Sequence, residues 1–233
     1  MIPIDDGPRR VRRLPIVTVC LLILNVSVFL YEVSLGAGAE QFIRLYGAVP
    51  REILTGQDVP PAGPNPLWLQ LLTSMFLHGG WLHLISNMIY LCIFGDDIED
   101  VLGHGRYLLF YLGAGVAASL VQLSLSGPSE TRPNVGASGA IAGALSAYLV
   151  LFPRRHIQVL IPVFFFATAQ VSAVVLLGFW FLLQFLNGVA ALGEGAAQVG
   201  GVAVWAHIGG FVAGFLIGLI MRSRFAFDRR AYT

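Results

Sequence analysis

Two polar residues in apolar surroundings have the types needed for nucleophilic catalysis. Ser138 stands in Gly136-Ala137-Ser138-Gly139, and His207 lies in a later apolar segment rich in Ala and Gly. Serine is a weak nucleophile until a base takes its proton, and His is the usual base near neutral pH. An ionisable His inside a hydrophobic span is costly and usually marks function. The pair predicts a serine hydrolase within a bilayer, although either residue alone could serve packing.

A second polar group precedes another apolar segment. His83 and Asn87 are four residues apart, which places them on one face of a helix. Two donors there suit a developing oxyanion, but they could also bridge helices by hydrogen bonds. His78 precedes Gly79-Gly80 and is expected to organise a loop. A metal site of His78, His83 and His207 is disfavoured, because the chain has no His-Glu-x-x-His motif and its outer carboxylates are scattered.

The composition indicates an integral membrane protein. The chain is 56% hydrophobic and 12% charged, whereas soluble domains carry about 25% charged residues. Spanning a bilayer takes about 20 apolar residues per helix. We therefore expect an all-α polytopic membrane protein, a bundle of six transmembrane helices, of which the second and fourth are short. The predicted spans cover residues 14–35, 81–94, 106–125, 137–152, 157–187 and 202–221.

The distribution of arginines predicts the orientation. All 14 basic residues are Arg, and the net charge of +1 gives no reason to expect a nucleic-acid partner. With six spans and both termini in the cytoplasm, Arg44, Arg51 and Arg132 lie outside and the other 11 lie inside, as the positive-inside rule requires. The membrane domain then covers residues 14–222, with cytoplasmic tails at 1–13 and 223–233. No organelle-targeting segment is visible, so we expect a prokaryotic cytoplasmic membrane. A cleaved signal peptide is the alternative for the first span, which is longer than usual for one.

One connection is long enough to hold structure of its own. Residues 36–66 link the first two spans, and their Pro-rich part at 60–66 cannot be a regular helix. The apolar segment 67–77 is too short for a span and suits an interfacial or re-entrant element beside the site. The simpler interpretation is a surface loop. Cys20 and Cys92 fall within spans, so we expect no disulfide framework.

Small residues predict close helix packing. Gly210, Gly214 and Gly218 recur every four residues in the last span, and Gly139 and Gly143 do so in the fourth. Such faces let helix backbones approach closely in a membrane. Because His207 and Ser138 lie beside these faces, a hydrogen bond between them is geometrically reasonable.

These motifs resemble those of the rhomboid family of intramembrane serine proteases. The family's Gly-x-Ser-Gly matches residues 136–139, and its His-x-x-x-x-His-x-x-x-Asn matches His78, His83 and Asn87. Its Ala-His with spaced glycines matches Ala206-His207, Gly210 and Gly214. The likeness covers residues 67–221 in the family's order and spacing.

The resemblance implies a Ser138–His207 dyad without an acidic third member. It also implies an oxyanion hole formed by His83, Asn87 and the backbone N–H of Ser138, with Gly136, Gly139 and His78 as structural neighbours. By analogy the substrates are single-span membrane proteins, cut near the outer face, and no metal or cofactor is implied. The family's connection between the fifth and sixth spans caps the site, which here corresponds to residues 188–201.

The sequence departs from the family's pattern at two places. Many members carry Trp-Arg in the first outer loop where this chain has Leu69-Gln70, and some carry a Tyr against the catalytic His where this chain has Ala142. The anchoring of the loop and the support of His207 must therefore differ.

A catalytically silent relative that binds transmembrane helices, or a proton-coupled transporter, would be the competing functions. The sequence does not predict an oligomeric state.

Overall fold

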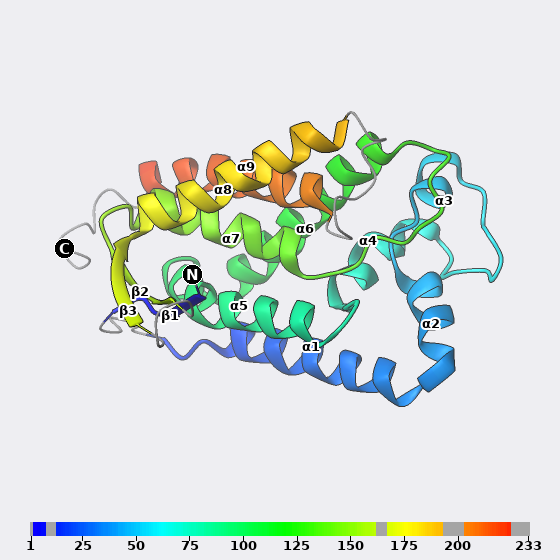
Figure 1. The fold of residues 1–233 in the computed structure, drawn as a ribbon, viewed down its shortest axis with the longest axis horizontal. Helices are drawn as coiled ribbons and strands as arrows, with labels where there is room; N and C mark the ends of the chain where they lie inside the picture. Colours follow the sequence, from blue (N-terminus) through cyan, green and yellow to red (C-terminus); the bar gives the residue numbers. More distant parts are fainter. Residues whose placement is uncertain (1, 8–12, 162–166, 193–202, 225–233) are drawn as a thin grey trace.

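The computed structural model describes residues 2–7, 13–161, 167–192 and 203–224, and most of these are helical (Figure 1). The principal helices run side by side between two ends of the molecule. They are α1 (Ile16–Ser34), α5 (Trp81–Leu102), α6 (His104–Ser126), α7 (Ser138–Leu151), α8 (Ala173–Leu192) and α9 (Val204–Arg224).

Four of these helices, α1, α6, α8 and α9, are long and apolar enough to cross a membrane. A fifth span results if α5 is joined to the short helices before it, from which it is bent by 82°. Helix α7 has 14 residues and is the shortest of the set. Within the described residues, length and composition thus support four or five of the six predicted spans. The chain is a multi-pass integral membrane protein.

A three-stranded antiparallel sheet lies at one end of the bundle and corrects the all-α prediction. Its strands are β1 (Ile2–Asp5), β2 (His156–Ile161) and β3 (Ala167–Ser172), in the order β1-β2-β3. The predicted span 157–187 was therefore wrong at its start, because its first residues form strands and α8 begins at Ala173. An uninterrupted apolar run does not by itself distinguish a buried strand from a helix. Strand β2 pairs with β3 on one side and, on the other, with β1, which is far away in sequence.

Helix α5 continues to Leu102, beyond the predicted end at Phe94. The acidic residues that follow Phe94 in this helix have partners within the protein. The carboxylate of Glu99 accepts hydrogen bonds from the N–H groups of Val17 and Thr18, each at 2.8 Å. The first N–H groups of α1 have no partners within their own helix, so Glu99 satisfies two of them. A buried carboxylate with such partners is compatible with a helix interior.

The long connection after α1 is structured, as expected for its apolar part. It contains α2 (Ala39–Tyr46), α3 (Pro50–Thr55) and three short helical pieces, η2 (Leu67–Leu69), α4 (Gln70–Thr73) and η3 (Ser74–Phe76). Helices α2 and α3 lie at the end of the molecule opposite the sheet (Figure 1). The loop before α7 pairs with this connection through a bridge between Ala48 and Asn134.

The predicted small-residue packing is confirmed, because α9 packs closely against α7. A Cβ atom on Gly214 would overlap the backbone of Gly143, and one on Gly218 would lie 3.1 Å from the Cα atom of Ala147. Only glycine permits so close an approach of two helix backbones. This contact sets the separation of the helices that carry Ser138 and His207.

Candidate active site

Ser138 and His207 meet where α7 and α9 approach. The Ser138 Oγ lies 2.7 Å from the Nε2 atom of His207. His207 is buried, and Ser138 is partly exposed. The distance is that of a hydrogen bond between a nucleophile and its base. The structure therefore brings together the two residues that the sequence singled out.

The chain turns sharply just before Ser138. Gly136 has a φ of 125° and donates its N–H to the carbonyl oxygen of Ser74 at 2.9 Å. A Cβ atom on Gly136 would lie 2.8 Å from two atoms of the His83 ring. Glycine is thus required both for the backbone conformation and for the approach of His83. Ser138 is the first residue of α7, where the N–H groups have no intrahelical acceptor.

His83 and Asn87 lie on α5 and line the same cavity as Ser138 and His207. Asn87 is buried, and its Nδ2 atom has no hydrogen-bond partner within the described residues. The N–H of Gly79 donates a hydrogen bond to the Nδ1 atom of His83 at 3.4 Å. Because Nδ1 is then the acceptor of a neutral imidazole, the ring proton lies on Nε2. Two donors are therefore available beside the serine.

Helix α8 contacts the other side of His207. The Oε1 atom of Gln184 lies 2.8 Å from the His207 Nδ1 atom. The ring of Trp180, one turn earlier, packs against the imidazole with its centroid 5.6 Å away. Neither residue was predicted from the sequence. Gln184 and Asn187 are the two carboxamide side chains of an otherwise apolar helix, and that rarity was the available signal.

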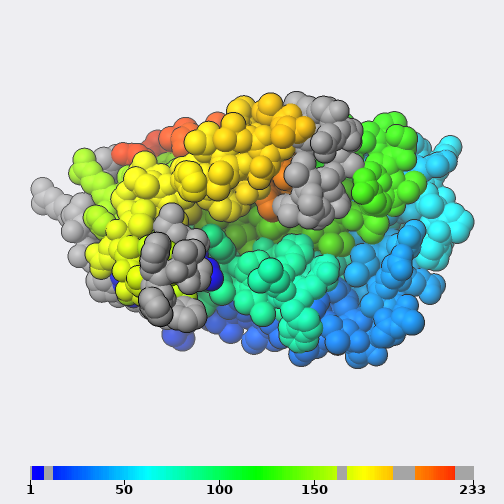
Figure 2. Space-filling model, viewed as in Figure 1, coloured from blue at the N-terminus to red at the C-terminus, as the bar shows by residue number. Residues whose placement is uncertain are grey.

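The cavity has a volume of about 800 Å³ and extends between α5 and α8. On the face shown in Figure 2, α8 (yellow) and α5 (blue-green) border a hollow with α7 (green) beneath it. Ile141, Ala142 and Leu145 of α7 line it, together with Trp180. Ala142, with its small side chain, and His207 both line this cavity.

A second, smaller cavity of about 20 Å³ lies on the other side of Ser138. Ser74, Ser119 and Gln122 are among the polar residues that line it. This volume is enough for one water molecule, and the polar lining suits one. Gln122 also accepts a hydrogen bond from the N–H of Ala206 at 3.1 Å, next to His207.

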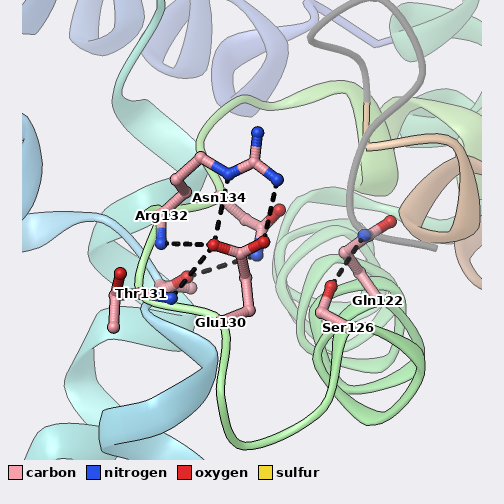
Figure 3. Close-up of polar contacts among 7 residues, drawn as sticks. Gln122, Ser126, Glu130, Thr131, Arg132 and Asn134 are labelled. Atoms are coloured by element: carbon pink, nitrogen blue, oxygen red, sulfur yellow. Dashed lines mark hydrogen bonds and ion pairs between the residues drawn. The ribbon is translucent and has the colours of Figure 1, made fainter. Parts of the chain in front are cut away.

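The loop between α6 and α7 is held by its own polar side chains (Figure 3). The carboxylate of Glu130 accepts hydrogen bonds from the Arg132 side chain and from the N–H groups of Thr131 and Arg132. The Arg132 guanidinium is the main reason that the pKa of Glu130 lies below its ordinary value. Asn134 joins this loop to Ala48. These contacts order the segment that leads into Gly136.

The long connection between α1 and α5 is anchored by Gln70. Gln70 is fully buried, and its side-chain NH₂ donates a hydrogen bond to the buried carboxylate of Glu52. Its Oε1 atom accepts one from the N–H of Val49 at 3.2 Å. A neutral amide paired with an internal carboxylate thus holds this connection in place.

His78 lies in the loop before α5, away from the Ser138–His207 pair. It is buried, its ring packs against His83 with centroids 5.1 Å apart, and its backbone N–H points at the Glu32 carboxylate at 3.3 Å. Gly139 packs against α6, since a Cβ atom there would lie 2.6 Å from the Cβ of Ala118. No group of three potential metal ligands gathers in the described parts of the chain. The predicted cap at 188–201 and the predicted C-terminal tail at 223–233 lie largely outside the described residues, whereas the predicted N-terminal tail at 1–13 contains strand β1.

Comparison with known proteins identifies relatives of this chain. A family model described as Rhomboid domain matches residues 65–224. The rhomboid protein YdcA of Bacillus subtilis is 30% identical over 176 residues, covering 73% of this chain and 74% of YdcA. Rhomboid protease GluP of the same species is 29% identical, covering 88% of this chain but 35% of GluP. Rhomboid protein 1, mitochondrial, of Saccharomyces cerevisiae is 30% identical, covering 85% of this chain and 51% of the yeast protein.

Proposed function

Because the chain belongs to the rhomboid family, we propose that it is an intramembrane serine endopeptidase acting on single-span membrane proteins. The observation that carries this proposal is the 2.7 Å approach of Ser138 Oγ to His207 Nε2. It occurs in a cavity that also presents His83 and Asn87. A silent relative that merely binds helices has no need for this combination.

In the proposed reaction Ser138 is the nucleophile and His207 the general base. The Oγ atom attacks the scissile carbonyl carbon while its proton passes to His207 Nε2. The C–N bond then breaks, and His207 gives this proton to the departing amine. A water molecule attacks the resulting Ser138 ester, losing its proton to His207, and the ester bond breaks to free the second product and the serine.

Three donors are positioned to stabilise the oxyanion of the tetrahedral intermediates. These are the N–H of Ser138, the Nε2–H of His83 and the Nδ2 group of Asn87. The unpartnered Asn87 amide supports this role, because a buried donor without an acceptor is costly unless an acceptor arrives during function. Each such donor contributes about 2.7–4 kcal/mol to lowering the barrier.

We further propose that α7 is a short sixth span and that both termini are cytoplasmic. Arg44 and Arg51 lie on α2 and α3, at the end of the molecule opposite the sheet (Figure 1). Arg155 and Arg222 flank the ends of α7 and α9 near the sheet. The positive-inside rule then puts the sheet in the cytoplasm and Ser138, at the opposite end of α7, near the outer face.

The proposal is tested with purified protein in proteoliposomes and a model single-span substrate. Wild type should cleave the substrate, and Ser138→Ala should not, while unfolding at the same temperature. A fluorophosphonate probe, which reacts with activated serines, should label wild type alone. A folded wild type that neither cleaves nor reacts with the probe would favour a silent helix-binding relative.

A further inference from the structure

The contact between Gln184 and His207 has no counterpart in a two-residue site. We propose that Gln184 is a positioning residue that fixes the tautomer and orientation of His207. The inference rests on the proposed function, since it assigns a third member to the same site. Both ring nitrogens of His207 have partners, Ser138 at Nε2 and Gln184 at Nδ1.

The chemistry of the two groups determines the direction of each hydrogen bond. A neutral imidazole carries one N–H and one lone pair. With Gln184 Oε1 facing Nδ1, the ring proton is held on Nδ1, and the lone pair of Nε2 points at the Ser138 hydroxyl. That is the tautomer a general base requires. The opposite tautomer would present an N–H to the serine and could not take its proton.

The same hydrogen bond strengthens as the reaction proceeds. When Nε2 takes the proton of Ser138, the ring becomes an imidazolium, and Nδ1–H becomes a charged donor to the amide oxygen. Charge-assisted hydrogen bonds are about twice as strong as neutral ones. Gln184 therefore supports the transition state more than the resting state, which lowers the barrier rather than improving substrate binding.

Helix α8 presents two groups to His207 on one face. Trp180 and Gln184 are four residues apart, so both side chains project toward the same neighbour, and the Trp180 ring packs on the imidazole. Helix α7 offers the buried Ala142 beside the cavity instead of a large side chain. The support of His207 thus comes from α8, which explains how the site holds its base without a tyrosine on α7.

The test compares variants of Gln184 in proteoliposomes with the model substrate. Gln184→Met keeps an unbranched chain but removes the acceptor, and we expect kcat to fall by about 10- to 100-fold with KM nearly unchanged. Gln184→Glu restores an oxygen acceptor and should keep kcat within about tenfold of wild type. The matched control is Asn187→Leu, which removes the exposed amide of α8 and should leave both constants unchanged.

Nuclear magnetic resonance of ¹⁵N-His-labelled protein reads the tautomer directly. The His207 signals, identified by their loss in His207→Ala, should report Nδ1–H in wild type and in Gln184→Glu, and a mixture of tautomers in Gln184→Met. Wild-type kcat in Gln184→Met, or equal losses in the Met and Glu variants, would overturn the proposal. Cleavage by Ser138→Ala would instead refute the proposed function, so the two failures are distinguishable.

Discussion

Gly210 on α9 lies directly against Gly139 on α7, so that a Cβ atom on Gly210 would overlap the Gly139 carbonyl oxygen. Gly139 follows the proposed nucleophile, and Gly210 lies one turn after the proposed base. The contact is therefore what brings Ser138 Oγ within 2.7 Å of His207 Nε2. The packing of α7 against α9 therefore determines the geometry of the site.

Substituting Gly210→Ala should separate the two helices and weaken both stability and activity. Overpacking costs about 1–3 kcal/mol, and a misplacement of about 1 Å at a catalytic group reduces the rate about 100-fold. Thermal unfolding in detergent and cleavage of the model substrate measure the two effects. Gly113→Ala is the control, because a Cβ atom there meets no atom within 4 Å; a matching loss in that variant would argue against the packing explanation.

Removing one oxyanion donor should slow the reaction without abolishing it. His83→Ala and Asn87→Ala are each expected to lower kcat by about 100-fold, since the Ser138 N–H and one side chain remain. Single-turnover cleavage measures the loss. Ser124→Ala, on the exposed side of α6 with its hydroxyl bonded to the Leu120 carbonyl, should retain full activity. If either donor variant is as inactive as Ser138→Ala, the auxiliary role is wrong.

The sequence predicts the candidate reactive groups but not all of the residues that hold them in place. Ser138, His207, His83 and Asn87 were predicted from residue type and spacing, and the structure places all four on one cavity. Gln184 was missed because an amide in an apolar helix does not by itself reveal which neighbour it faces. That neighbour depends on how α8 packs against α9, which is information that no local pattern contains.

The errors in the predicted fold have the same cause, because they too depend on contacts between elements. The apolar run from residue 157 forms strands because β2 pairs with the neighbouring β3 and also with β1, about 150 residues earlier. The acidic residues after Phe94 remain part of α5. Glu99 accepts a hydrogen bond from α1, and Asp97 pairs with Arg155, which follows α7. The long apolar helices could be predicted because their signal is continuous and local, whereas each of these features depends on residues remote in sequence.

The Gln70–Glu52 pair should anchor the outer loop by its hydrogen bond rather than by its shape. Gln70→Leu leaves the buried Glu52 carboxylate without this donor, which should destabilise the protein by about 1–3 kcal/mol. Replacing both partners by Leu should recover part of that loss, because no buried carboxylate then remains, although the N–H groups of Val49 and Val59 lose their acceptors. Denaturation in detergent measures both, with the exposed Gln57→Ala as control. A double variant less stable than Gln70→Leu would refute this account.

Arg155 should hold the three-stranded sheet to the helix bundle. Its guanidinium contacts the carboxylates of Asp6 and Asp97, and Asp6 also accepts a hydrogen bond from the Tyr148 hydroxyl at 2.9 Å. Arg155→Met would leave two largely buried carboxylates without their cation, at a cost of about 3 kcal/mol. The neighbouring exposed Arg154→Met is the control. Equal unfolding temperatures for the two variants would show that the ion pairs do not matter.

The central claim is that Ser138, activated by His207, cleaves peptide bonds of membrane proteins. The most direct measurement is cleavage of a single-span substrate in proteoliposomes by wild type and by Ser138→Ala at matched folded protein. We predict that wild type yields two fragments and that the variant, although folded, yields none. Cleavage by Ser138→Ala at the wild-type rate would contradict the account.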